Sequence, residues 1–217
     1  MSIAATSLQV GARTCACPPP TGPPRLIAVT GGPGAGKTAV LELARLQLCQ
    51  HVAVLPEAAG VLFGGGFPRM ADHPSRRCAQ RAMFHVQRQL ERLAIEQGTF
   101  HAVLCDRGTL DGIAYWPGTA EAWCTDLGTT LADERGRYSA VIHLRPPGDA
   151  QGYNHDNHLR TESSDEAGRI DDRILAAWEG HAQLGRVDRS DDFVEKTSRA
   201  LALLHRALPE ECRPPTG

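Results

Sequence analysis

The sequence predicts an α/β fold in which helices cover both faces of a mostly parallel, five-stranded sheet. Short apolar runs rich in β-branched residues alternate with longer segments of helical periodicity along most of the chain. A glycine-rich turn joins the first apolar run to the first helical segment. The length of 217 residues fits one domain. Together these observations are typical of a three-layer sandwich.

The expected strands are short and mostly apolar, as buried parallel strands are. They cover residues 25–30, 51–56, 100–105, 139–144 and 186–188. Pro56 closes the second of them, and Asp106 follows the third directly. The fifth strand is the shortest and rests on three residues alone.

The expected helices follow the strands in alternation. They cover residues 39–50, 75–97, part of 119–133, 163–183 and 191–207. A glycine-rich loop of residues 60–74 leads into the second helix, and Gly98 ends that helix. Its predicted apolar stripe consists of Ala79, Ala82, Met83, Val86, Leu90 and Leu93.

The two ends and one internal segment lack such periodicity. Residues 1–24 contain five prolines and predict a disordered leader. The domain then covers residues 25–208, and residues 209–217 form a tail. Within the domain, residues 146–162 are polar and irregular, and their length favours a functional lid over a plain connection.

Composition excludes several classes of protein. The formal net charge of −2 lacks the electrostatic signature of a general nucleic-acid binder. No apolar run approaches the roughly 18 residues of a membrane span, and the start of the chain does not resemble a signal peptide. We therefore expect a cytoplasmic protein without nucleic-acid or membrane partners, whose oligomeric state the sequence does not indicate.

The seven cysteines favour reduced thiols over a metal site. Only Cys15 and Cys17 lie close in sequence, and the leader offers no second Cys or His pair nearby. His155 and His158 in the polar segment also lack a second ligand pair, so we interpret them as loop polarity.

The glycine-rich turn carries the strongest motif in the chain. Gly31, Gly36, Lys37 and Thr38 satisfy the Walker A pattern G-x-x-x-x-G-K-[ST], with a strand before it and a helix after it. Such a loop wraps nucleotide phosphates with backbone N–H groups. Lys37 is expected to neutralise phosphate charge, and the Thr38 hydroxyl to bind Mg²⁺. The expected phosphate-binding residues are Gly31, Gly32, Pro33, Gly34, Ala35, Gly36, Lys37, Thr38 and Ala39.

Further candidates follow the next strands, whose carboxyl ends share one edge of the predicted sheet. Asp106 has the Walker B form and is a candidate Mg²⁺ ligand, although an Asp here can also cap a turn. Arg107 can hold a phosphate or an acceptor group, or pair with a surface acid. Glu57 can orient or deprotonate an attacking hydroxyl, or be a solvated helix-start carboxylate. Arg160 in the lid can reach a transferring phosphoryl group, with Arg145 and Arg169 as weaker competitors.

Four segments carry a family resemblance that runs from about residue 25 to residue 208. GGPGAGKT, LPEAAG, CDRGTLDGIAYW and DNHLRTESSDEA resemble AAA-type P-loop ATPase and kinase domains, in particular those similar to nicotinamide-riboside kinases. The deoxynucleoside and thymidylate kinases are more distantly similar.

The resemblance implies a P-loop fold in which the Walker A strand and the strand before Asp106 are neighbours. It implies that Glu57 is a base or metal partner, that Asp106 and Arg107 are the acid–arginine pair, and that Arg160 is the lid arginine. Asp111 would line the acceptor pocket. Gln87 is a weaker candidate for the same pocket, or a solvated surface residue.

These observations predict an ATP- and Mg²⁺-dependent small-molecule kinase that moves a γ-phosphoryl group to an acceptor hydroxyl. Its expected partners are a nucleotide and a small nucleoside-type acceptor. The expected catalytic residues are Lys37, Glu57, Asp106, Arg107 and Arg160. Thr38 and Asp106 would hold the metal, and Glu57, Arg107 and Asp111 would bind the acceptor. The alternative is a slow ATPase or regulatory switch that acts through a protein partner.

Overall fold

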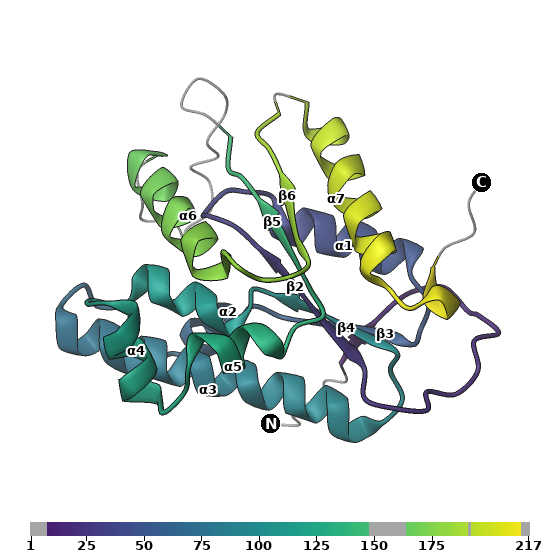
Figure 1. Cartoon of the computed structure of the whole chain (residues 1–217), viewed down its shortest axis with the longest axis horizontal. Helices are drawn as coiled ribbons and strands as arrows, with labels where there is room; N and C mark the ends of the chain where they lie inside the picture. Colours follow the sequence, from purple (N-terminus) through teal and green to yellow (C-terminus); the bar gives the residue numbers. More distant parts are fainter. Residues whose placement is uncertain (1–7, 148–163, 191, 214–217) are drawn as a thin grey trace.

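A six-stranded sheet forms the centre of the computed structural model, which describes residues 8–147, 164–190 and 192–213 (Figure 1). The strands of this described part are β1 (Gln9–Val10), β2 (Arg25–Thr30), β3 (Val52–Leu55), β4 (Ala102–Asp106), β5 (Ala140–Leu144) and β6 (Leu184–Val187). Their order across the sheet is β1-β3-β4-β2-β5-β6. All neighbours are parallel except β1, which is antiparallel to β3.

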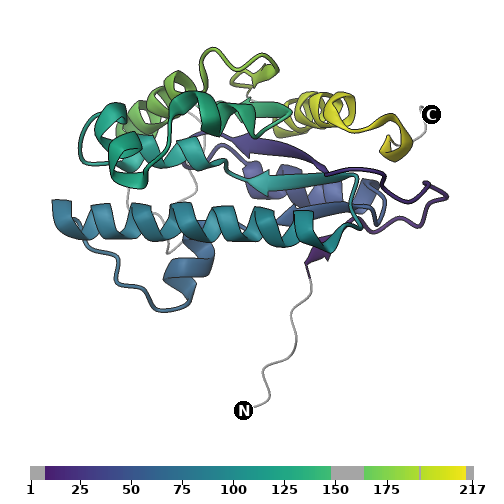
Figure 2. The ribbon, with the colours of Figure 1, turned by 60° about the horizontal axis from the view of Figure 1, so that its bottom comes forward.

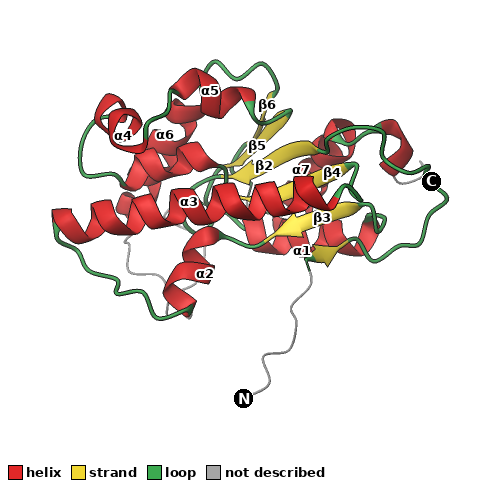
Figure 3. Ribbon diagram, turned by 90° about the horizontal axis from the view of Figure 1, so that it is seen from below, coloured by secondary structure: helices red, strands yellow, loops and turns green. Residues whose placement is uncertain are grey.

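Helices form a layer on each face of the sheet. They are α1 (Lys37–Gln47), α2 (Ala58–Gly64), α3 (His73–Gln97), α4 (Ala120–Leu127), α5 (Leu131–Gly136), α6 (Ser164–Trp178), α7 (Phe193–Ala207) and the 3₁₀ turns η1 (Thr109–Tyr115) and η2 (Glu210–Cys212). Figure 3 shows α3 across one face, with α1 and α7 behind the sheet.

Alternate residues of the central strands enter two separate cores. In β2, Leu26 and Ala28 pack toward α3, α6 and η1, whereas Ile27 and Val29 pack toward α1 and α7. This period of two buries both faces of the strand, which explains why β2 is apolar almost throughout. The predicted α/β sandwich with its mostly parallel sheet is confirmed, and β2 and β4 are neighbours as expected.

The strand β1, which the sequence did not predict, corrects the prediction that residues 1–24 form a disordered leader. Residues 8–24 are described, and Gln9 and Val10 pair with β3, which the five-stranded prediction left at the edge. The backbone N–H of Gly11 then donates to Val52 O at 2.9 Å, and that of Arg13 to Leu48 O at 3.0 Å. Backbone bonds of this kind satisfy an exposed strand edge whatever the side chains are, so composition did not reveal them.

Three helical predictions also change. Residues 119–133 hold α4 and the start of α5, which are separated at Gly128, a residue with φ of 65°. The predicted loop of residues 60–74 contains most of α2. The buried residues of α3 are Ala79, Gln80, Phe84, Gln87, Glu91 and Ala94, which share only Ala79 with the predicted stripe. Three of those buried residues are polar, so a search for apolar residues at helical spacing did not identify the buried face.

The predicted lid of residues 146–162 lies outside the described residues except for 146 and 147, and Arg160 lies outside them. The predicted tail begins with η2, in which Cys212 is buried. No helix in the described ranges has the length and apolar character needed to cross a membrane.

Candidate active site

The carboxyl ends of β2, β3 and β4 open into a cavity of about 860 Å³. The loop from Pro33 to Ala39 lines one part of it, and Glu57, Asp106 and Arg107 line the middle. Side chains of α2, α3 and η1 line the remainder. The sheet topology therefore brings together residues that the sequence places in four separate segments, as parallel strands do at their carboxyl edge.

The glycines of the Walker A loop divide into two groups. Gly34 and Gly36 have φ of 78° and 90°, which only glycine adopts readily, and both line the cavity. Gly31 and Gly32 form the start of the loop, where it contacts β5 and α6. A Cβ on Gly31 would be 2.0 Å from Leu144 O, and the Gly32 N–H already donates to Asp171 Oδ1 at 2.7 Å. Their part is therefore to let the loop pack closely on β5 and α6.

Lys37 is the buried cation of the loop. Its Nζ donates to Gly31 O at 3.0 Å and to Gly32 O at 3.1 Å. Burial and, to a lesser extent, the nearby Arg107 guanidinium lower the pKa of Lys37 to about 8. An anionic phosphate in the cavity would favour the protonated form, so the structure holds a cation ready for such a ligand.

Thr38 and Asp106 form the candidate metal site. Thr38 Oγ1 donates to Asp106 Oδ2 at 3.5 Å, and Asp106 Oδ1 is buried without a hydrogen-bond partner in the described part of the chain. Burial raises the pKa of Asp106 to about 6. An unpartnered carboxylate oxygen beside a hydroxyl is a donor set that suits Mg²⁺, so these residues fit the ion.

We expect metal binding at this site to weaken below about pH 6, because a protonated Asp106 is a poor ligand. The apparent metal dissociation constant should rise about tenfold for each pH unit below that value. Water-proton relaxation of bound Mn²⁺ in the presence of ADP measures it. The variant Asp106→Asn should bind Mn²⁺ weakly at neutral pH and lose this pH step, and an unchanged step in that variant would contradict the assignment.

Arg107 is held between two carboxylates. Its Nε donates to Glu57 Oε1 at 2.5 Å, and its Nη1 donates to Asp111 Oδ2 and to Gly31 O, both at 3.2 Å. Its backbone φ is 78°, a conformation that costs a non-glycine residue on the order of 1 kcal/mol. These contacts fix the guanidinium beside the phosphate-binding loop.

Glu57 follows β3 after Pro56 and is the N-cap residue of α2. Burial alone would raise its pKa, but the charges of Arg107 and Lys37 outweigh that effect and lower the pKa below its usual value. Glu57 is therefore ionised at neutral pH. Such a carboxylate accepts a hydrogen bond from a hydroxyl and orients it, whereas its strength as a base is reduced.

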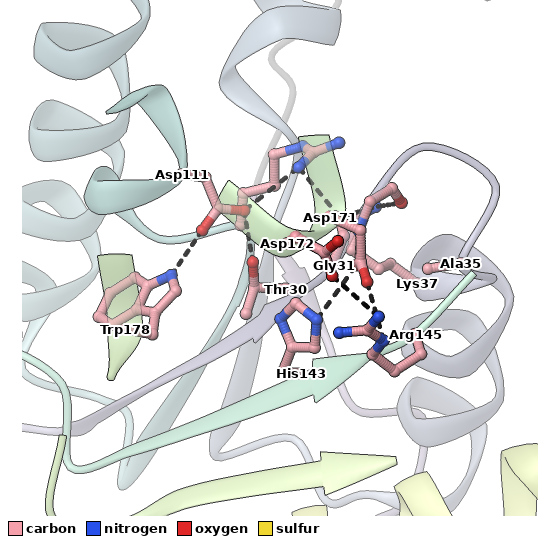
Figure 4. Close-up of polar contacts among 12 residues, drawn as sticks. Thr30, Gly31, Ala35, Lys37, Asp111, His143, Arg145, Asp171, Asp172 and Trp178 are labelled. Atoms are coloured by element: carbon pink, nitrogen blue, oxygen red, sulfur yellow. Dashed lines mark hydrogen bonds and ion pairs between the residues drawn. The ribbon is translucent and has the colours of Figure 1, made fainter. Parts of the chain in front are cut away.

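Asp111 lines the cavity, but its oxygens already accept three hydrogen bonds from the protein (Figure 4). Thr30 Oγ1 donates to Oδ2 at 2.5 Å, and Trp178 Nε1 donates to Oδ1 at 2.7 Å. The third bond comes from Arg107. Its contacts therefore orient Arg107 and tie η1 to β2 and α6.

A second group of buried charges supports the Walker A loop from α6 and α7, and the sequence patterns did not indicate it. Asp171 accepts from the Gly32 N–H, and its oxygens lie 3.1 Å from His143 Nε2 and from Arg145 Nε (Figure 4). Arg145 also bonds Asp172 at 2.9 Å, so this competitor of the lid arginine is held in internal ion pairs. Lys196 donates to Ala35 O at 3.0 Å.

The sequence contains a pattern that could have identified Asp171 and Lys196. Asp171 lies on the buried stripe of α6, among Ala167, Ile170 and Ile174. Lys196 lies on the stripe of α7 that also holds Thr197, Ala200 and Leu204. A charged residue on a mostly apolar stripe must find a partner in the fold, and here the Walker A loop is among the partners of both residues.

The far end of the cavity combines aromatic and amide side chains. Phe84 and Trp123 meet edge to face with ring centroids 5.4 Å apart, and Gln80 and Gln87 of α3 line the same end. Gln87 Nε2 donates to Glu91 Oε1 at 2.8 Å, so the prediction of a solvated Gln87 is wrong and the residue is buried. Trp123 Nε1 is buried without a hydrogen-bond partner among the described residues.

The fold and the glycine-rich loop together define a P-loop protein with the fold of nucleotide-binding kinases. Residues 26–196 match the AAA domain family, and the chain belongs to this family. The resemblance noted in the sequence is thus confirmed. No curated protein matches the sequence significantly.

Solved structures show the same fold at low sequence identity. A NadR protein in complex with NR has a TM-score of 0.61 and 17% identity, over 85% of this chain and 52% of that chain. A NadR protein in complex with NAD and AMP-PNP has a TM-score of 0.58 and 16% identity, over 85% and 49%. Thymidylate kinase from Ehrlichia chaffeensis has a TM-score of 0.51 and 16% identity, over 83% and 97%. The chain spans about half the length of the NadR chains it matches.

Proposed function

We propose that this protein is an ATP- and Mg²⁺-dependent phosphotransferase that moves a γ-phosphoryl group to a hydroxyl of a small nucleoside-type acceptor. One observation carries the proposal. The cavity continues from the Walker A loop past Arg107 and Glu57 to the aromatic and amide residues of α3 and α4. A slow ATPase or a regulatory switch needs the phosphate end alone, whereas a kinase needs the adjoining space for a second substrate.

The far end of the cavity suits a nucleobase. Phe84, with Trp123 packed edge to face against it, forms an aromatic boundary for a planar ring, and the amides of Gln80 and Gln87 at the same end can hydrogen-bond its edge. Trp123 Nε1 is a further donor without a partner in the described structure. The solved NadR complexes with NR and with NAD and AMP-PNP support a nucleoside or nucleotide acceptor beside ATP.

In the proposed reaction the acceptor oxygen forms a bond to the γ-phosphorus while the bond from that phosphorus to the β–γ bridging oxygen breaks. ADP leaves, and the hydroxyl proton passes by way of Glu57 to water. Lys37 and Arg107 neutralise phosphate charge, and Glu57 accepts the hydrogen bond of the attacking hydroxyl. Thr38 and Asp106 would hold Mg²⁺, which would supply positive charge to the phosphates. Arg160 remains a proposed phosphate contact, and it lies outside the described residues.

The test is transfer of label from γ-labelled ATP to pooled nucleosides, nucleotides and vitamin precursors. We expect label on one acceptor, and we expect Glu57→Gln to reduce that transfer by about 10²-fold or more while ATP binding persists. The matched control is Glu96→Gln, which changes an exposed carboxylate of α3 and should leave transfer intact. The kinase proposal is wrong if free phosphate is the sole product and its rate of release changes neither with any acceptor nor with Glu57→Gln. That result would favour the ATPase or switch.

A further inference from the structure

Four side chains with metal-binding atoms converge at the edge of the sheet opposite the candidate active site. Cys15 and Cys17 belong to the segment after β1, and Cys49 and His51 belong to the turn between α1 and β3. One ligand atom from each lies within 4.8 Å of the others. The cluster precedes β3, whereas the Walker A loop follows β2, and in a parallel sheet these positions are at opposite edges.

Backbone hydrogen bonds hold the two segments together without help from a ligand. Arg13 and Cys49 form a parallel bridge, in which Gln50 N donates to Arg13 O at 3.0 Å. Two residues further along each segment, Cys15 Sγ lies 3.1 Å from His51 Nδ1. The Val52 N–H closes the turn by donating to Cys49 O at 3.0 Å. The register of the backbone thus places Cys15 opposite His51.

One pair of sulfurs has the spacing of tetrahedral coordination. Zinc binds thiolate sulfur at about 2.3 Å, so two sulfurs on one tetrahedral ion lie about 3.8 Å apart. Cys17 Sγ and Cys49 Sγ are 3.9 Å apart. Three sulfurs and one imidazole nitrogen make the Cys₃His set of structural zinc sites, which fills all four positions and leaves none for a substrate.

The surroundings of the cluster also suit a structural site. Cys49 is buried, and Cys15, Cys17 and His51 are half-buried. Cys212 of η2 lies 3.5 Å from Cys49 Sγ, where it can hydrogen-bond a metal-bound thiolate. Figure 2 shows the segment after β1 beside the end of α7 that leads to η2. The cluster therefore joins the N-terminal segment, the start of β3 and the end of the described chain.

We propose that Cys15, Cys17, Cys49 and His51 bind one Zn²⁺ in a closed structural site that ties the N-terminal segment to the sheet. The expectation that Cys15 and Cys17 lack a partner pair came from their distance in sequence from Cys49 and His51. The fold brings these four residues together in space. This site does not depend on the proposed phosphotransferase activity, and the two proposals stand or fall separately.

The test is the zinc content of the full chain, purified without chelators or added metal and measured by mass spectrometry. We expect one zinc per chain, and we expect Cys15→Ser and Cys49→Ser each to lose most of it. The matched control is Cys78→Ser, which removes an exposed thiol of α3 and should retain the metal. Because Cys49 is buried and its variant can fail to fold, Cys15→Ser on the half-buried segment decides the ligand assignment.

A second readout identifies the ligands directly. Titration of the metal-free chain with Co²⁺ should give the strong visible absorption of a tetrahedral site and the charge-transfer band of cobalt–thiolate bonds, and Cys78→Ser should give the same spectrum. A chain with free thiols and no zinc, a disulfide among these cysteines in place of metal, or equal zinc loss in Cys78→Ser would each overturn the proposal.

Discussion

Replacing Lys37 with alanine is expected to reduce phosphoryl transfer by at least about 10³-fold while the protein stays folded. The Lys37 ammonium group contacts only carbonyl oxygens of its own loop among the hydrogen bonds found in the described residues, so its removal breaks no link between distant elements. The substitution instead lowers the transfer rate, because one cation fewer stabilises the phosphate charge in the transition state. Label transfer from ATP measures the first effect, and the urea unfolding midpoint measures the second.

The pKa of Lys37 gives this prediction a pH signature. Burial lowers that pKa to about 8, so the metal- and nucleotide-free protein loses the Lys37 proton as the pH rises through about 8. ATP requires the protonated form, and its affinity should therefore fall about tenfold per pH unit above that point. Lys37→Ala should bind ATP weakly with no such step. The control Arg92→Ala removes an exposed cation of α3 and should resemble the parent protein in both measurements.

The second large effect is expected for Gly31→Ala, which should lower the free energy of unfolding by about 3–5 kcal/mol. Gly31 has φ of 133°, a conformation that alanine adopts only with strain. The added Cβ would also lie 2.0 Å from Leu144 O, a backbone atom of β5. Because β5 pairs with both β2 and β6, the strand cannot move aside without breaking sheet hydrogen bonds.

Gly168→Ala is the matched control, since Gly168 lies within α6 and a Cβ there meets nothing within 4 Å. This variant should gain about 0.5–1 kcal/mol, because alanine has the higher helix propensity. Urea titrations of the two variants measure both changes. Equal stability of Gly31→Ala and the parent protein would show that the loop packs on β5 less tightly than the structure indicates.

Local sequence patterns correctly predicted those structural features that depend on residues close together in the sequence. The strand–turn–helix of the Walker A loop and the carboxylate at the end of β4 follow from spacing alone, because parallel strands present their carboxyl ends at one edge. Glu57, Asp106 and Arg107 do line one cavity with the loop. Their roles in catalysis stay predictions that the experiments above address.

The patterns failed where distant segments supply each other's partners. Gln87 belongs to a polar buried face of α3 that no apolar period reveals, since Gln87 and Tyr138 both donate hydrogen bonds to Glu91. The strand β1 is two residues long and owes its place to the free edge of β3. The cluster of Cys15, Cys17, Cys49 and His51 requires residues separated by more than thirty positions to meet, and only the topology brings them together.

The contacts of α6 have a geometric consequence for the site. Asp171 bonds the phosphate-binding loop at Gly32, and Trp178 bonds Asp111, which in turn orients Arg107. Both bonds come from one continuous helix, whose rise of 1.5 Å per residue sets these two attachment points about 10 Å apart along its axis. A helix is stiff along that direction. Because α6 contacts the Walker A loop at Gly32 and, through Asp111, Arg107, a movement of α6 would shift the loop and the arginine together.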